Sequence, residues 1–360
     1  MLCLARSGNS KLIDGYFENW KAPVSPGGGG NSNPSYYKKD VQSCNHVLYS
    51  FLCLDQHPNA GFPAKKYWDG KALYETMTAA DVIEVMTETN PRWQNPNEWQ
   101  RSKVSALIDS VHENKGKFIW AIGGWSDLTQ TLREDQIPHF VELCVKLLKL
   151  DNGKMGDGID FDWEHLSDDA RIKDEQRMRL AKTMLALRAA LDNAGMQDKT
   201  VGYTTRFNAF WDDKHGNIPA HYTSFESDGE GLKIAETMNE LGASLNDVVD
   251  WVHIMEYDVR PSDLNCPDRM QLSAYVAVFD AFTNYVDKNK IVMGFEPGHQ
   301  AGGGLWEGSM VDKQVIDYIQ ENNLGGVMFW AVNEHATLPE TGMTGKNAQE
   351  LAKYAKSKFH

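Results

Sequence analysis

Four acidic side chains lie within eight residues in the segment Asp157-Gly-Ile-Asp-Phe-Asp-Trp-Glu164. Strand residues alternate between the two faces of a sheet, so Asp160, Asp162 and Glu164 would share one face. Consecutive carboxyl groups would then lie roughly 6–7 Å apart, from a rise of about 3.3 Å per residue. Ionised carboxylates in such a row repel one another, so at least one is expected to hold a proton near neutral pH. A held proton beside a fixed carboxylate is the chemistry that cleavage of a glycosidic bond requires.

The opposite face of this segment argues against a solvent-exposed acidic surface. Asp157 has the opposite parity to the other three acids, which predicts a structural role at the start of the strand. Ile159, Phe161 and Trp163 share its face, and an apolar row there argues against a solvated acidic surface. A divalent-metal site is an alternative, because rows of Asp and Glu also bind Mg²⁺ or Ca²⁺. We favour acid–base chemistry and expect neither a metal nor a cofactor.

The composition limits the classes of partner. The chain has 360 residues, 41% of them hydrophobic and 11% aromatic, which suffices for one large barrel or two ordinary domains. The formal net charge is −14 and no basic run occurs, so nucleic acid and anionic membranes are poor candidates as partners. A neutral polysaccharide is compatible with this charge.

Five cysteines are scattered along the chain without a CxxC pair or a zinc-like spacing: Cys3, Cys44, Cys53, Cys144 and Cys266. Cys53 and Cys144 lie in apolar runs and are expected to be small buried hydrophobic residues, while a disulfide elsewhere stays open. The first ten residues hold too short an apolar run for a signal peptide, and no apolar run of 18 residues occurs.

Eight short apolar runs alternate with amphipathic segments along the chain. The predicted strands are 12–17, 46–54, 117–122, the acidic segment, 201–207, 248–257, 291–295 and 325–331. The predicted helices lie near 36–41, 98–114, 136–150, 174–194, 231–242, 271–288, 311–322 and 346–358. This alternation predicts a parallel sheet, and the number of strands favours a closed (β/α)8 TIM barrel.

The domain organisation follows from the same pattern. No internal repeat and no low-complexity linker divides residues 1–360, so we expect a single domain with the barrel over about 11–358 and a long loop over 55–97. A doubly wound open sheet is the alternative fold, but no G-x-G-x-x-G follows the first predicted strand.

In such a barrel, functional groups collect at the C-terminal ends of the strands. The predicted ends carry carboxylates, tyrosines and large aromatic residues, namely Tyr16, Phe17, Phe51, Trp125, Asp162, Glu164, Met255, Tyr257, Asp258, Phe329 and Trp330. Sugars bind through faces that stack on aromatic rings and through polar groups that meet their hydroxyls, so this mixture predicts a saccharide cleft.

These segments resemble the glycoside hydrolases of family 18, the chitinases and related enzymes. DGIDFDWE matches the family signature DGxDxDxE at every fixed position. The resemblance also covers the strand order from Leu12 to Ala331, Gly123-Gly124-Trp125 after the third strand, Met255-x-Tyr257-Asp258 in the sixth and Trp330 in the eighth.

The resemblance implies a role for each of these residues. Glu164 would be the general acid and later the base, in a family where the substrate's own acetamido group replaces the second catalytic carboxylate. Asp162 would orient that acetamide, Asp160 would share a proton with Asp162, and Tyr257 would hydrogen-bond the acetamide oxygen. Trp330 would form the floor of the subsite, surrounded by the other implied substrate-binding residues: Tyr16, Phe51, Gly124, Trp125, Met255 and Asp258.

Two departures from the family pattern carry consequences. Ala121 stands where many members have a serine that supports the deepest aspartate, so Asp160 is expected to depend on Tyr16 alone and the pH profile to shift. The connection between the last two strands is too short for the extra α+β domain of many processive chitinases, which implies an open, endo-acting groove.

The resemblance implies a retaining endo-chitinase that acts on β-1,4-linked N-acetylglucosamine polymers. An endo-β-N-acetylglucosaminidase that cuts N-glycans is the alternative within the family, and a non-catalytic chitin-binding lectin is the alternative outside enzymes. The expected partner is chitin or an N-acetylglucosamine oligosaccharide, without nucleic acid or membrane, and membership of a larger assembly stays open. We expect the protein to act outside the cell.

Overall fold

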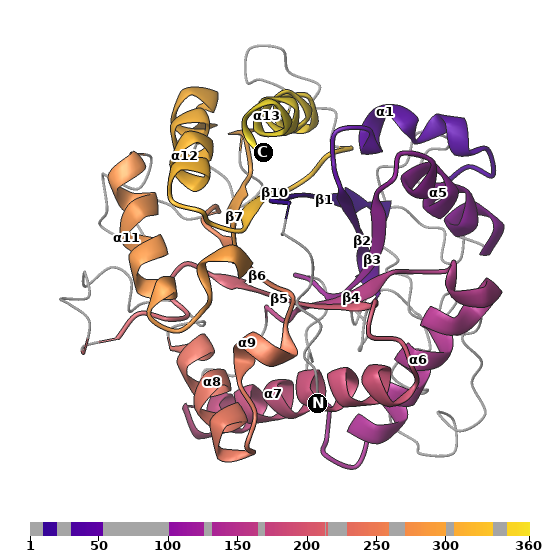
Figure 1. Cartoon of the computed structure of the whole chain (residues 1–360), viewed down its shortest axis with the longest axis vertical. Coiled ribbons are helices and arrows are strands. Elements are labelled where there is room, and N and C mark those ends of the chain that lie inside the picture. The colour runs from indigo at the N-terminus through magenta and orange to yellow at the C-terminus, as the bar shows by residue number, and fades with distance from the viewer. Residues whose placement is uncertain are drawn as a thin grey trace.

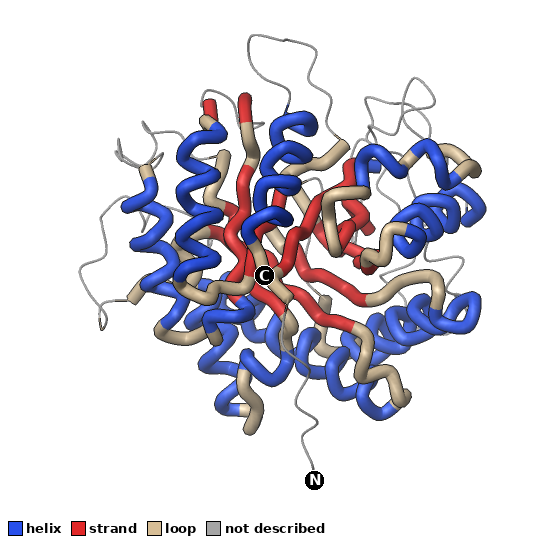
Figure 2. The backbone as a smooth tube through the Cα atoms, turned by 45° about the horizontal axis from the view of Figure 1, so that its top comes forward, coloured by secondary structure: helices blue, strands red, loops and turns tan. Residues whose placement is uncertain are grey.

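The computed structural model describes residues 10–19, 30–52, 101–125, 132–164, 170–212, 214, 229–258, 271–299, 306–333 and 344–360. At its centre, eight parallel strands close into a barrel that helices surround (Figures 1 and 2). The barrel strands are β1 (Leu12–Glu18), β2 (His46–Leu52), β3 (Lys117–Gly123), β4 (Gly158–Asp162), β5 (Thr200–Arg206), β6 (Trp251–Met255), β7 (Ile291–Phe295) and β10 (Gly326–Phe329). The predicted (β/α)8 TIM barrel is therefore confirmed.

The strands follow one another around the barrel in chain order, and each is parallel to both neighbours. Closure occurs between the first and the last strand, where Leu12 pairs with Gly326 and Gly15 pairs with Phe329. Because β1 also pairs with β2, its two edges are both occupied, and this excludes the doubly wound open sheet.

The helices form the outer layer in Figure 1. They are α1 (Lys38–Val41), α5 (Arg101–Glu113), α6 (Ile137–Gly153), α7 (Ala170–Asn193), α8 (Glu230–Glu240), α9 (Leu245–Val248), α11 (Leu272–Thr283), α12 (Ser309–Glu321) and α13 (Thr344–Lys358). Short 3₁₀ turns occupy Pro34–Tyr36 and Lys288–Lys290. Apart from α9, each helix corresponds to a segment that its apolar periodicity predicts.

Small elements escape the sequence pattern because they are too short for a period to show. Besides α9, these are β8 (Gly298–His299) and β9 (Trp306–Glu307), an antiparallel pair that precedes α12. The predicted long loop over 55–97 lies outside the described residues, and the domain limits stay a prediction.

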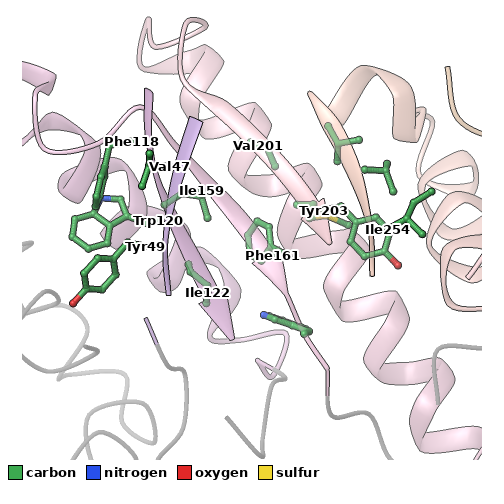
Figure 3. Packing of buried hydrophobic residues seen from close by; sticks show 14 of the residues in the cluster. Val47, Tyr49, Phe118, Trp120, Ile122, Ile159, Phe161, Val201, Tyr203 and Ile254 are labelled. Carbon is green, nitrogen blue, oxygen red and sulfur yellow. The ribbon is translucent and has the colours of Figure 1, made fainter. Parts of the chain in front are cut away.

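Alternation along the strands separates two apolar layers. One layer fills the space between strands and helices, and Figure 3 shows part of it, including Trp120 of β3, Ile159 and Phe161 of β4 and Tyr203 of β5. The other layer lies inside the barrel and is smaller, with Leu48, Ile119, Ala121, Trp251, Val292 and Met328 among its members. Asp160 lies between Ile159 and Phe161 in the chain and therefore points into the barrel.

Two buried thiols agree with the expected packing role of cysteine. Cys144 on α6 is a free, buried thiol, as predicted, and so is Cys44. Burial raises the pKa of both thiols, which keeps them protonated and unreactive. Cys53 lies outside the described residues. Among the helices that the structure describes, none combines the length and the hydropathy needed to cross a bilayer.

Replacing Phe161 tests the outer apolar layer. Its ring is fully buried, with its centroid 6.2 Å from that of Phe140 on α6. Phe161→Ala leaves a cavity there, and we expect it to lower the free energy of unfolding by about 3–5 kcal/mol, read from urea unfolding. Met310→Ala is the control, because the Met310 side chain is 74% exposed. Equal unfolding midpoints for the two variants would contradict this packing.

Candidate active site

The three acids of the signature lie at increasing height at the C-terminal end of β4. Asp160 and Asp162 belong to the strand and are buried, whereas Glu164 follows two residues after the strand ends. The chain holds this end of β4 close to β3, where the Gly124 N–H donates to the Asp162 carbonyl oxygen over 2.8 Å. Gly123 has a φ of +114°, and a Cβ there would lie 2.2 Å from the same oxygen, so only glycine fits.

Asp160 is held by three side-chain donors from three strands. Tyr16 Oη and Thr204 Oγ1 donate to its Oδ2 over 2.9 and 2.8 Å, and Trp251 Nε1 donates to its Oδ1 over 2.9 Å. The expected support from Tyr16 is confirmed, but the prediction that Tyr16 would be the sole support of Asp160 is wrong. Thr204 and Trp251 compensate for Ala121.

Glycine makes the contact between Trp251 and Asp160 possible. Gly202 is the β5 neighbour of Asp160, as Ala121 is its β3 neighbour. A Cβ at Gly202 would lie 2.2 Å from Trp251 Nε1 and 2.3 Å from Asp160 Oδ1. The small residues on both sides of Asp160 thus leave the space that the indole occupies. Strand parity places Thr204 and Trp251 inside the barrel, but it does not give the register that brings them to Asp160.

Asp162 has the environment of a carboxyl group that keeps its proton. Burial, and then the nearby charges of Glu164 and Asp160, raise the pKa of Asp162 well above its ordinary value, although Arg206 opposes the shift. Its Oδ1 is buried and has no hydrogen-bond partner among the described residues. The direction of this pKa shift agrees with the retained proton that the crowded acidic row predicts.

Arg206 is the residue of this site that sequence reasoning missed. It ends β5, and its Nη2 lies 3.0 Å from Glu164 Oε2 in an ion pair whose side chains are 14% and 10% exposed. A guanidinium at this distance favours the ionised form of a carboxyl group. Its position at a strand end, two residues after Thr204, was the available signal.

Met255 ends β6 and Tyr257 follows it two residues later, and both are buried. The Tyr257 hydroxyl donates to Met328 Sδ over 3.8 Å. Burial, and then the charge of Asp162, raise the pKa of Tyr257 well above its ordinary value. Tyr257 is therefore a neutral phenol that can donate a hydrogen bond. Asp258 is partly exposed, with a φ of +59°.

Aromatic rings from three strand ends form one cluster. The rings of Phe51 and Trp330 stack with centroids 5.8 Å apart and an interplanar angle of 14°, and Tyr16 lies 5.5 Å from Trp330. Gly124 packs on Phe51, since a Cβ there would lie 2.4 Å from that ring. Trp125 differs from this cluster because its side chain is 63% exposed.

Asp157 lies outside the site, as its parity predicts. Its Oδ2 lies 2.7 Å from His112 Nε2 and accepts from the Phe118 N–H over 2.8 Å, so it ties the start of β4 to α5 and β3. Although burial alone would raise its pKa, the hydrogen bonds from His112 and Phe118 lower the pKa of Asp157 below its ordinary value. Among the described residues, no group of three or more His, Cys, Asp or Glu side chains is arranged to hold a metal ion.

Comparison with known proteins agrees with this geometry. The sequence matches the family described as Glycosyl hydrolases family 18 over residues 13–301, more than half of the chain. The chain belongs to family 18. No curated protein matches the sequence significantly.

Solved structures of chitinases share the fold. Catalytic domain 2 of the Group II chitinase of Ostrinia furnacalis aligns with a TM-score of 0.60 and 14% identity, covering 97% of each chain. Chitinase ChiA74 from Bacillus thuringiensis aligns with a TM-score of 0.57 and 16% identity, over 97% of this chain and 70% of its own. A GH18 chitinase from Cycas revoluta in complex with (GlcNAc)4 has a TM-score of 0.57 and 14% identity, over 96% and 99%.

Because Asp162 is buried, we expect its replacement by asparagine to stabilise the folded protein near neutral pH. Because its pKa in the folded state lies above that of the unfolded chain, about 3.9, stability is lost as the pH rises from there through the folded-state pKa. Asp162→Asn cannot ionise, so we expect a higher urea midpoint than the wild type near pH ~7 and a difference that vanishes toward pH ~4.

Asp135→Asn is the control for this measurement, because the Asp135 side chain is 69% exposed in its pair with Arg133. It should show no comparable gain near neutral pH. If the urea midpoint of Asp162→Asn equals or falls below that of the wild type at neutral pH, the ionised form of Asp162 does not destabilise the folded protein and the expectation is wrong.

Proposed function

We propose that this family 18 glycosidase is a retaining, endo-acting chitinase that hydrolyses β-1,4-linked N-acetylglucosamine polymers with the help of the substrate's acetamido group. The observation that carries the proposal is the graded acidic row: a fixed Asp160, a proton-retaining Asp162 and a partly accessible Glu164. The chitinases with the same fold, one of them in complex with (GlcNAc)4, support the choice of polymer.

In the proposed first step, Glu164 donates its proton to the glycosidic oxygen as the bond from that oxygen to the anomeric carbon breaks. The carbonyl oxygen of the 2-acetamido group attacks the same carbon, and a cyclic oxazolinium ion forms. Asp162 leaves its proton with Asp160, turns toward Glu164 as a carboxylate and accepts the acetamide N–H, so that its negative charge faces the developing positive charge. Asp160 remains bound by its three donors.

In the second step, Glu164 takes a proton from water, whose oxygen attacks the anomeric carbon and reopens the ring. Two inversions at this carbon give net retention. Tyr257, a neutral phenol, donates its hydrogen bond to the acetamide oxygen and holds that oxygen near the anomeric carbon. Trp330, stacked on Phe51, supplies the apolar floor, and the exposed Trp125 extends the surface for further sugars.

Glu164→Gln tests the role of the general acid. We expect kcat on N-acetylglucosamine oligomers to fall by roughly 10²–10⁴-fold, the range typical of a lost general acid, while oligomer binding is retained. Product analysis by mass spectrometry and NMR would follow chain cleavage and anomeric configuration. Glu134→Gln is the control, because Glu134 pairs with Lys182 at the surface.

The same assay separates the alternatives. Cleavage of a high-mannose glycoprotein together with inert chitin oligomers would replace the chitinase proposal by an endo-β-N-acetylglucosaminidase. A wild-type protein that binds the oligomers without turnover would be a lectin.

Arg206→Met tests the ion pair with Glu164. Methionine keeps part of the apolar stem and removes the charge that favours the ionised carboxylate 3.0 Å away. A general acid must hold its proton, so we expect the alkaline limb of the kcat profile to move to higher pH. Arg133→Met, which breaks a surface pair with Asp135, should leave the profile unchanged. An unmoved alkaline limb in Arg206→Met would contradict the effect of this pair on the acid.

A further inference from the structure

A buried histidine lies directly behind Asp160. His253 points into the barrel from β6 and is 0% exposed. Its Nε2 lies 2.7 Å from Asp14 Oδ2 on β1, and its Nδ1 lies 3.0 Å from Thr204 Oγ1 on β5. Because Thr204 Oγ1 donates to Asp160 over 2.8 Å, the four side chains form one chain of contacts, Asp14–His253–Thr204–Asp160.

The surroundings of His253 are otherwise apolar. The titratable groups that face it are Asp14 and Tyr16 from β1, Asp160 from β4, and His46 from β2, whose Nδ1 lies 3.2 Å from Asp14 Oδ1. The strands β3, β7 and β10 contribute apolar side chains to this layer: Ile119, Ala121, Val292 and Met328. Ionisable groups are costly in such surroundings, and apolar residues would fill the same space at least as stably. A purely structural role explains this arrangement poorly.

Asp14 fixes one nitrogen of His253. Although burial alone would raise it, the nearby His46 and His253 hold the pKa of Asp14 below its ordinary value. An ionised Asp14 accepts a hydrogen bond, so the Nε2 of His253 carries a proton and points it at Asp14. The state of Nδ1 then decides what Thr204 does.

Thr204 has one hydroxyl proton and three neighbours that can receive it: Asp160 Oδ2, His253 Nδ1 and the hydroxyl oxygen of Tyr16, which lies 2.9 Å away. When Nδ1 carries a proton, it donates to Thr204 Oγ1, and the Thr204 proton goes to Asp160. When Nδ1 lacks a proton, it competes with Asp160 for the Thr204 proton. The orientation of one buried hydroxyl group therefore couples His253 to Asp160.

We propose that His253, oriented by Asp14, is a positioning residue for the catalytic acids and acts on Asp160 through the Thr204 hydroxyl. The inference rests on the proposed glycosidase activity and deepens it, because it assigns the polar residues that replace the support missing at Ala121. Neither His253 nor Asp14 contacts the substrate in this role.

Two substitutions separate the two ends of the imidazole. His253→Gln places an amide where Nε2 lies, so it keeps the contact with Asp14 and loses the contact with Thr204. Thr204→Val removes the hydroxyl and keeps the side-chain shape. On N-acetylglucosamine oligomers we expect each variant to lose roughly tenfold in kcat, the lower range for residues that orient a ligating or catalytic group, with KM within about twofold of the wild type.

A double-mutant cycle gives the decisive result. If His253 acts through Thr204, the double variant loses no more kcat than Thr204→Val alone, because the hydroxyl group through which His253 acts is already absent. His112→Gln is the matched control, because it breaks a His–Asp contact of the same 2.7 Å length away from the acids.

Two outcomes would overturn the inference. These are additive losses in the double variant, or full activity of His253→Gln beside an active wild type. If His253→Gln does not fold, Thr204→Val carries the test alone, and unchanged kcat in that variant refutes the chain of contacts. A wild type without turnover on any oligomer refutes instead the proposed function, so the two failures are distinguishable.

Discussion

An acidic side chain at the centre of a closed barrel has to be stabilised by hydrogen bonds, because its burial removes it from bulk solvent. Asp160 is in this position, and its three donors come from β1, β5 and β6. The donors need room, and Ala121 and Gly202 on the flanking strands leave it. The inside of the barrel is therefore arranged around one carboxyl group, and the apolar residues of this layer fill the space that remains.

The other two acids differ from Asp160 because they lie closer to the end of β4. Asp162 is buried, and its Oδ1 has no hydrogen-bond partner among the described residues, so burial and then the charges of Glu164 and Asp160 raise the pKa of its carboxyl group. Glu164 lies beyond the strand and pairs with Arg206. Three carboxyl groups of one segment thus acquire three different environments from depth and neighbours alone: hydrogen-bond donors around Asp160, burial and like charge around Asp162, and an ion pair at Glu164.

The sequence was sufficient for the barrel, for the orientation of the acidic row and for the structural role of Asp157, because parity and periodicity are local properties. It was insufficient for the support of Asp160. Ala121 lacks the side-chain partner that the family resemblance leads one to expect. Thr204 and Trp251 replace that partner from positions 44 and 91 residues away in the chain. Only the register of the strands brings them to Asp160, and register is not visible in the sequence pattern. The role of Arg206 was missed for the same reason, because its ion pair with Glu164 depends on how far β5 extends past the end of β4. Elements as short as β8 and β9 carry no period at all.

The contacts around Asp160 join parts of the chain that are far apart: Asp14 meets His253 across 239 positions, and Tyr16 meets Asp160 across 144. No fragment that lacks the first or the sixth strand can assemble them. The proposed catalytic centre therefore requires the first, fourth, fifth and sixth strands to be assembled, because Asp160 and its three donors come from them. The proposed glycosidase activity would accordingly appear only after these strands have come together.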